Sequence, residues 1–137
     1  MAHTRLDEAA ALTVADVVHR KFSALPADAT IGDVRDWFAA SASRRMAFLA
    51  EDGRYAGSLT PIDVDGGVDP TRPAAEVVHD GPTVLPDAAA TEGERLALQT
   101  EARRVPVVDG DGLLVGVVSV TEDLQAFCGT GGGAAEC

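Results

Sequence analysis

An internal repeat limits the possible folds of this chain more than any other feature of its sequence. Residues Ala15, Val17, Val18, His19, Leu25 and Pro26 recur in the same order as Ala75, Val77, Val78, His79, Leu85 and Pro86. The pairs Arg44-Arg45 and Asp52-Gly53 recur as Arg103-Arg104 and Asp111-Gly112, with the spacing shortened by one residue. Each copy is too short to bury a core alone, so the repeat predicts two similar units packed with pseudo-twofold symmetry and paired grooves at their interface.

Local patterns predict the same order of elements in both copies. Hydrophobic spacing predicts a short helix after Thr13, and Thr30 with Asp33 forms a capping box that begins a second helix. Strands over 46–50 and 55–59 follow, joined by a hairpin turn. The second copy predicts helices over 74–79 and 91–101, strands over 105–108 and 114–118, and a last helix over 119–127. The expected fold class is therefore mixed α/β, with a small βαββα unit in each repeat.

The same patterns set the expected boundaries along the chain. Residues 1–12 form an N-terminal helical extension, 13–65 the first repeat and 73–128 the second. Residues 66–72 are expected to be a linker, because glycine, proline and aspartate interrupt regular structure there. The glycine-rich residues 129–137 are expected to form a flexible tail.

Composition indicates a folded chain and excludes several classes of partner. The 137 residues are 46% hydrophobic and 24% charged, which is enough to build a core. A net charge of −11 argues against nucleic-acid binding and against docking to an anionic membrane. The sequence has no apolar run long enough to cross a bilayer and no apolar signal core at its start, so a cytoplasmic location is expected. Cys128 and Cys137 are expected to be free thiols.

The motif with most functional content runs from Gly57 to Asp63, where a predicted strand leads into a predicted helix. Thr60 is a good N-cap, Pro61 suits the first helical position and Asp63 suits the first turn. A hydroxyl, backbone N–H groups and a carboxylate converge there, which would suit a phosphorylated ribose. The motif recurs, altered, from Gly116 to Glu122. Helix capping alone would also explain these residue types.

In order of elements and in the recurring Gly-x-x-Thr/Ser-x-x-Asp motif, the chain resembles a tandem cystathionine-beta-synthase (CBS) domain pair, or Bateman module. Arg104-Val105-Pro106-Val107-Val108-Asp109, before a hairpin, is also typical of that family. The resemblance covers residues 13–128. It implies two symmetry-related clefts, with an adenosyl ligand such as AMP, ADP, ATP or S-adenosylmethionine bound in one or both of them, and it implies a homodimer.

The resemblance also implies which residues contact a ligand. Thr60 and Ser119 would bind ribose or phosphate, Asp63 and Glu122 the ribose hydroxyls, and the arginine pairs phosphate. The full expected set is Ala24, Leu25, Arg44, Arg45, Gly57, Thr60 and Asp63 in the first cleft, and Val84, Leu85, Arg103, Arg104, Gly116, Ser119 and Glu122 in the second. Glu122 is longer than the usual aspartate and Ala47 stands where the second repeat has Pro106. The cleft of Thr60 and Asp63, which keeps the aspartate, is therefore expected to be the occupied one.

The expected function is a stand-alone regulatory module that signals to an unidentified protein partner by a conformational shift. The sequence lacks a nucleophile elbow, a paired-cysteine metal spacing and a phosphate-binding glycine loop, so an enzyme is not expected and no cofactor is required. The alternative is a ligand-free structural or dimerisation module with vestigial clefts. A weaker alternative is an enzyme or metal-dependent sensor using His19, His79 and the cysteines.

Overall fold

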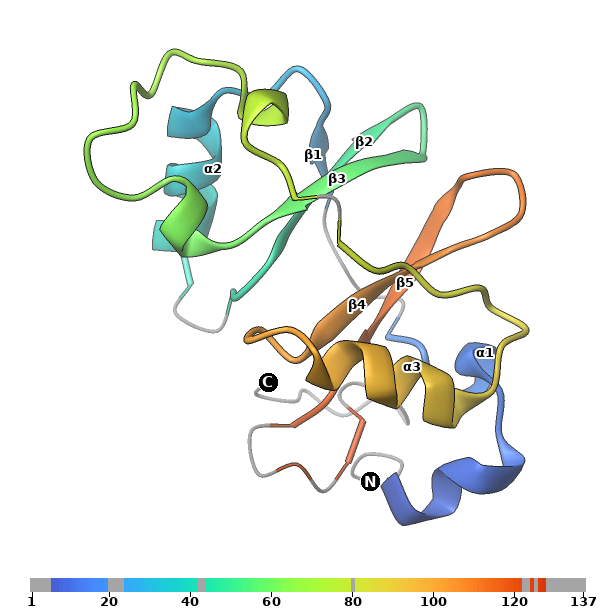
Figure 1. The fold of residues 1–137 in the computed structure, drawn as a ribbon. Coiled ribbons are helices and arrows are strands. Elements are labelled where there is room, and N and C mark those ends of the chain that lie inside the picture. The colour runs from blue at the N-terminus through green and yellow to red at the C-terminus, as the bar shows by residue number, and fades with distance from the viewer. Residues whose placement is uncertain are drawn as a thin grey trace. The chain divides into compact units, whose positions relative to one another are not determined.

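The computed structural model describes residues 6–19, 24–41, 44–79, 81–121, 124, 126 and 127 (Figure 1). The chain forms two compact units. The central unit is Ser23–Gly81, and the terminal unit combines Met1–Phe22 with Pro82–Cys137. Each unit contains strands and helices of similar kind, so the expected mixed α/β class is confirmed.

The central unit is a three-stranded sheet with one main helix. Its elements are β1 (Ala24–Pro26), α2 (Ile31–Ala39), β2 (Ala47–Glu51) and β3 (Arg54–Leu59), followed by the 3₁₀ turns η2 (Pro61–Asp63) and η3 (Ala74–Glu76). The strand order is β1-β2-β3, with β1 parallel and β3 antiparallel to β2. Helix α2 lies beside this sheet in Figure 1. The core is formed by Ala29, Ile31, Val34, Ala47, Leu49, Leu59, Val64 and Ala74.

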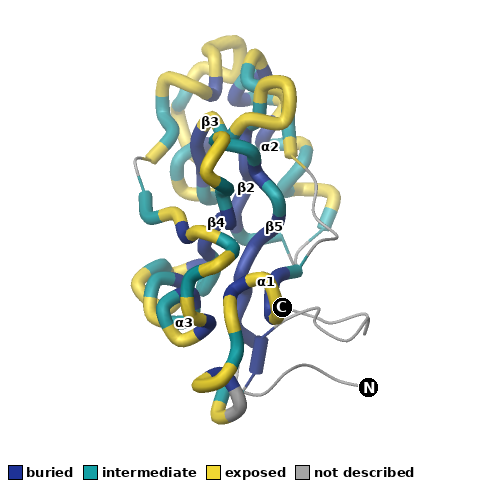
Figure 2. Tube along the Cα trace, turned by 90° about the vertical axis from the view of Figure 1, so that its right-hand side faces the viewer, coloured by how far each residue is buried: buried dark blue, intermediate teal, exposed yellow. Residues whose placement is uncertain are grey.

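The terminal unit has the same plan with a shorter sheet. Its elements are η1 (Leu6–Ala11), α1 (Val14–Val17), α3 (Ala90–Leu98), β4 (Arg104–Val108) and β5 (Leu114–Ser119). Strands β4 and β5 are antiparallel, and Figure 2 shows both largely in the colour of buried residues. The core is formed by Ala9, Val14, Val17, Val18, Val84, Ala90, Ala97, Val105, Val107, Val118, Val120 and Phe127.

A proline explains why the terminal unit lacks a third strand among its described residues. Val84 pairs in parallel with Val107, as Leu25 in β1 pairs with Leu49. Two residues beyond Leu25, the Ala27 N–H donates to the Ala50 carbonyl and continues the pairing. Two residues beyond Val84 stands Pro86, which has no N–H to donate, so the pairing stops at a single bridge.

The opening segment of each sequence repeat lies in the unit that contains the other repeat's strands. In the terminal unit, Thr13 bridges Ala89 and His19 bridges Val117. In the central unit, Pro73 bridges Thr30 and His79 bridges Ser58. The compact units therefore do not follow the expected repeat boundaries at 13, 65 and 73, because these openings pair across the sequence rather than with their own repeat.

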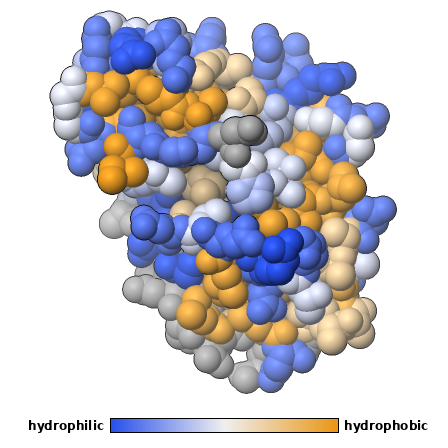
Figure 3. Space-filling view, in the orientation of Figure 1, coloured by the Kyte–Doolittle hydropathy of each residue, from blue (hydrophilic) through white to orange (hydrophobic). Residues whose placement is uncertain are grey.

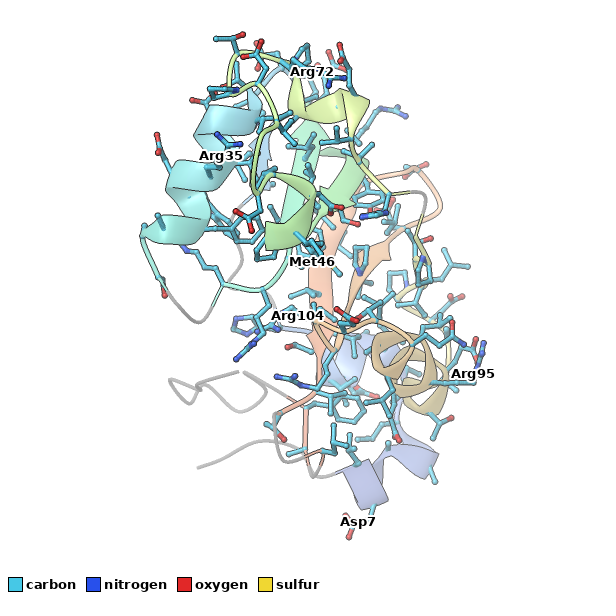
Figure 4. All side chains as sticks on the ribbon, turned by 60° about the vertical axis from the view of Figure 1, so that its left-hand side comes forward. Asp7, Arg35, Met46, Arg72, Arg95 and Arg104 are labelled. Carbon is cyan, nitrogen blue, oxygen red and sulfur yellow. The ribbon has the colours of Figure 1, made fainter. Side chains whose placement is uncertain are left out.

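The segments expected to be an extension and a linker both pack on a unit. Ala9 of η1 is fully buried in the terminal core. Residues 64–68 are held by Arg35 of α2, labelled in Figure 4, whose guanidinium donates to the carbonyls of Val64, Gly66 and Val68. The tail from 129 to 137 and both cysteines lie outside the described residues.

Capping correctly predicted the starts of two helices. Thr30 is the N-cap of α2: its Oγ1 accepts from the Asp33 N–H at 3.2 Å, and the Thr30 N–H donates to Asp33 Oδ2 at 3.0 Å. Thr13 is the N-cap of α1. Both results depend on residues within one helical turn, where sequence spacing determines contact.

The helices expected after the two motifs are not formed. After Thr60 the chain makes only the 3₁₀ turn η2, and the turn at Gly66-Gly67 follows soon after. After Ser119, the described residues up to 127 contain no helix: Val120 bridges Phe127, and the Thr121 N–H donates to the Ala126 carbonyl at 2.9 Å. Val120 and Phe127 are both fully buried, so folding back places two apolar side chains in the core.

Strand pairing also corrects the alignment of the two repeats. Pro106 pairs with Val117 and Phe48 pairs with Ser58, so Pro106 corresponds to Phe48 and not to Ala47. By the same register, Arg103 corresponds to Arg45. The expected alignment was wrong by one residue because the β4–β5 hairpin contains one more residue than the β2–β3 hairpin between equivalent pairs. Val108 pairs with Leu114, whereas its counterpart Ala50 pairs with Tyr55. The shared Asp-Gly turns concealed this difference.

Candidate functional site

In the central unit, the motif folds into a self-contained turn at the end of β3. The Thr60 N–H donates to Asp63 Oδ2 at 2.7 Å, and the Thr60 hydroxyl donates to the same oxygen at 3.0 Å. Thr60 is extended and begins η2, as expected of an N-cap, but its hydroxyl binds the carboxylate instead of a backbone N–H. The sequence therefore predicted which residues meet here, although it did not predict which group donates.

His79 also contacts Asp63, and sequence reasoning did not include it among the ligand-binding residues. Its Nε2 lies 2.6 Å from Asp63 Oδ1. The His79 N–H donates to the Ser58 carbonyl at 2.9 Å, which places the imidazole next to the motif. The one available signal was the recurrence of His19 and His79 at equivalent places, and their backbones do make equivalent bridges, to Val117 and Ser58.

The terminal unit presents the same motif differently. Ser119 is the last residue of β5 and pairs with Arg104, so it is a strand residue and does not cap a helix. It is only 2% exposed, and its Oγ has no hydrogen-bond partner within the part of the chain that the structure describes. Glu122, the expected carboxylate of this half, lies outside the described residues.

Two corresponding arginines also have buried nitrogens that find no partner among the described residues. Arg103 has a positive φ of 56° just before β4, and its Nε donates to the Val120 carbonyl at 3.3 Å. Its Nη2 is buried and unpaired among the described residues, as is Nε of Arg45 in the central unit. The arginine that precedes β2 and the one that precedes β4 therefore each retain a buried donor without a partner among the described residues.

The other two expected arginines make local contacts. Arg44 donates from Nη1 to the Trp37 carbonyl at 2.6 Å and lies 4.5 Å above the Trp37 ring centre, a cation–π geometry. Arg104, labelled in Figure 4, donates from Nη1 to the Ala102 carbonyl at 2.6 Å. Both contacts give these side chains a structural role.

The expected apolar residues differ in exposure. Ala24 is exposed and Leu25 is half-buried on β1, whereas Val84 is buried and Leu85 is 50% exposed. Strand pairing matches Leu25 with Val84, which accounts for the exposure of Leu85. On the face drawn in Figure 3, hydrophobic and hydrophilic side chains both reach the surface. The most exposed large hydrophobic residues among those described are Ile62, Leu85, Leu98 and Leu124.

Packing accounts for the two expected glycines. A Cβ on Gly57 would collide with the side chain of Val78, and a Cβ on Gly116 would collide with that of Val18. The two valines belong to the segments that pair with the motif strands, immediately before His79 and His19. The glycines therefore permit the close approach that places each histidine.

Two further classes of site find no support within the described ranges. No cluster of three or more histidine, cysteine, aspartate or glutamate side chains there could hold a metal ion. No helix in those ranges is long and apolar enough to cross a membrane.

Comparison with known proteins finds one matching family model and solved structures with a similar fold. Residues 73–122 match the family model of the CBS domain. No match was found among curated protein sequences. The CBS pair domain of a Shewanella oneidensis protein has a TM-score of 0.71 at 16% identity, covering 82% of this chain and 68% of that chain.

Two similar structures contain adenine nucleotides. CBSX2 from Arabidopsis thaliana in complex with AMP has a TM-score of 0.65 at 18% identity, covering 78% of this chain and 89% of that chain. The cytosolic domain of the Mg²⁺ channel MgtE in complex with ATP has a TM-score of 0.63 at 25% identity, covering 74% of this chain and 43% of that chain.

Proposed function

Because the chain is a tandem CBS domain pair, we propose that it is a regulatory module, and not an enzyme, whose ligand is an adenine nucleotide. Ligand binding would favour one of its conformations, and that change would be passed to a protein partner. Similar CBS-pair structures hold AMP or ATP, which supports this ligand class.

The observation that carries the proposal is the unused hydrogen-bonding capacity at the start of β4 and the end of β5. Ser119 Oγ and Arg103 Nη2 are both buried, and neither has a partner among the described residues. An unsatisfied buried polar group costs about 1–3 kcal/mol. A ribose hydroxyl or a phosphate oxygen would satisfy a serine hydroxyl and a guanidinium N–H, and Arg is well suited to phosphate.

The overall charge makes this local arginine important. The chain carries a net charge of −11, so its average field repels an anionic ligand. A nucleotide would therefore depend on donors close to its phosphates, where a charge-assisted hydrogen bond is strong. Arg103 is the donor in the terminal unit, and Arg45 is its counterpart in the central unit.

Calorimetric titration with AMP, ADP, ATP and S-adenosylmethionine would test the proposal. We expect an adenine nucleotide to bind the wild type, and Ser119→Ala to bind it about tenfold more weakly, since one buried hydrogen bond is lost. Ser119→Ala should also leave the ligand-free protein at least as stable, because it removes a buried hydroxyl that has no partner among the described residues. The control is Arg95→Ala, which removes an exposed side chain paired with Glu92. Absence of binding to the wild type would refute the proposal.

One observation favours the alternative of a ligand-free structural module. In the central unit, Thr60 and His79 already occupy both oxygens of Asp63. If the carboxylate of the motif were occupied in this way in both units, neither cleft would bind a ligand and both would be vestigial. The titration above decides between the two functions, because a vestigial module would bind none of the four ligands.

A homodimer and a cytoplasmic location remain predictions. Sedimentation equilibrium of the purified chain, with and without nucleotide, would measure the first. A mass of one chain at all concentrations would contradict it.

A further inference from the structure

Most of the hydrogen-bonding positions on the Asp63 carboxylate are already occupied by residues of the same unit, which leaves few for a ligand. Oδ2 accepts two hydrogen bonds from Thr60, at 2.7 and 3.0 Å, and Oδ1 lies 2.6 Å from His79 Nε2. An ionised carboxylate offers about four lone-pair positions. Three are therefore in use, and the side chain of Asp63 is only 12% exposed.

The three contacts differ in how readily they could be released. The bonds from Thr60 join residues within a single turn, and the Thr60 N–H cannot leave without unfolding η2. The side chain of His79 is 58% exposed, so its ring can rotate toward solvent while its backbone stays paired with Ser58. His79 is thus the partner that can be displaced from Oδ1.

We propose that the His79 imidazole occupies the ribose-binding edge of Asp63 in the ligand-free protein, so that a nucleotide binds this half only after displacing it. This inference rests on the proposed function. A ribose diol donates two hydrogen bonds to one carboxylate, and only one lone-pair position on Oδ1 remains beside His79. His79 and the ribose therefore compete for the same oxygen.

The packing of Val78 on Gly57 makes this competition a fixed property of the unit. Val78 contacts the position where a Cβ of Gly57 would stand, and the next residue, His79, pairs with Ser58. The backbone of His79 consequently stays paired beside the motif whenever the motif is folded, so the imidazole can always return to Asp63 Oδ1. The apparent affinity falls in proportion to the fraction of molecules in which Asp63 is accessible.

The test is an AMP titration followed by NMR at the backbone amides of Thr60 and Val64, which report on the Asp63 half alone. His79→Ala removes the hydrogen bond that competes with the ligand for Asp63 Oδ1. We therefore expect this variant to bind AMP about tenfold more tightly than the wild type. His79→Gln keeps a side-chain donor and is the matched control, with an affinity near that of the wild type. Thermal unfolding of both variants checks that the unit remains folded.

The possible outcomes separate this inference from the proposed function. Tighter binding by His79→Ala supports the inference. Equal or weaker binding, while AMP still binds the wild type, overturns the inference alone, and weaker binding identifies His79 as a ligand contact. If no adenine nucleotide binds the wild type or either variant at any site, both the proposed function and the inference are overturned.

Discussion

Gly57 lies directly against Val78: a Cβ built on the glycine would fall 2.8 Å from the Cβ of the valine. The backbone of Gly57 also has a φ of 132°, a conformation that residues with a Cβ rarely adopt. Gly116 meets Val18 in the same manner in the terminal unit. The first residue of the recurring motif is thus required by the segment that packs on it.

We expect Gly57→Ala to be strongly destabilising. Overpacking costs about 1–3 kcal/mol, and the positive φ adds strain of similar size. Urea denaturation would measure the loss in free energy of unfolding. Gly67→Ala is the control, because no atom lies within 4 Å of a Cβ at that position and its φ is not in the positive range. Equal transition midpoints for the two variants would contradict this explanation.

The second prediction concerns Arg35, whose guanidinium donates hydrogen bonds to three backbone carbonyls within residues 64–68. The bonds to Gly66 and Val68 measure 3.1 and 2.7 Å, and a third reaches Val64. Hydrogen bonds to charged groups contribute about 1.5–3 kcal/mol. Arg35→Ala should therefore destabilise the central unit by at least this amount and increase amide hydrogen exchange over residues 64–68. Arg35→Lys should recover only part of the loss, because it cannot span all three carbonyls.

The matched control for Arg35 is Arg95, whose guanidinium pairs with Glu92 at the surface. Exposed ion pairs contribute little, so Arg95→Ala should change the free energy of unfolding by less than about 1 kcal/mol. Exchange over 64–68 that stays at the wild-type level in Arg35→Ala would show that other contacts hold the segment.

The sequence predicted those features that depend on neighbouring residues. Thr30 and Asp33 form a capping box because three residues bring them within one helical turn. Thr60 and Asp63 meet for the same reason. The repeat likewise predicted two units of one plan, since equal patterns of side chains favour equal folds.

Features that depend on residues distant in the chain could not be read from the sequence. His79 approaches Asp63 only because its segment pairs with β3. Ser119 resembles a cap, but it is the last residue of β5, and the chain turns back after it so that Val120 and Phe127 are both buried. Because the hairpins differ by one residue, the sequence alignment matched Arg103 with Arg44. Only strand pairing shows that its counterpart is Arg45.

A surface carboxylate provides a prediction about pH. The pKa of Asp16 is lowered from its usual 3.8, first by the Thr13 backbone N–H and then by the Thr13 hydroxyl, which donate to Oδ2 at 2.8 and 3.0 Å. A lowered pKa in the folded state means that Asp16 stabilises α1 above pH 3.8. This contribution is lost as the pH falls through the folded-state pKa.

NMR titration of the Asp16 carboxyl carbon would measure that pKa. Thr13→Ala removes the hydroxyl but keeps the backbone N–H, so the pKa should rise toward 3.8 and remain below it. Thr71→Ala is the control, because Thr71 lowers the pKa of Asp69 in the same way and should leave Asp16 unchanged. An unaltered Asp16 pKa in Thr13→Ala would assign the whole effect to the backbone.

The last prediction uses the difference between the two long helices. Thr30 caps α2 through its side chain, whereas the N-cap of α3 is Ala89, which has no side-chain group to accept a hydrogen bond. Glu92 already stands at the third position of α3, where a capping box has its acidic residue. Ala89→Ser should therefore complete a capping box.

We expect Ala89→Ser to raise the free energy of unfolding by about 0.5–1 kcal/mol, and the reverse change, Thr30→Ala, to lower it by about 1 kcal/mol. Ala89 is exposed and extended, so the serine fits without repacking the core. Glu92→Ala also breaks the ion pair with Arg95, so the gain from Ala89→Ser is measured again in a Glu92→Ala background, where the part that depends on the reciprocal bond should be absent. An equal gain from serine in both backgrounds would mean that serine accepts from the backbone alone, without the box.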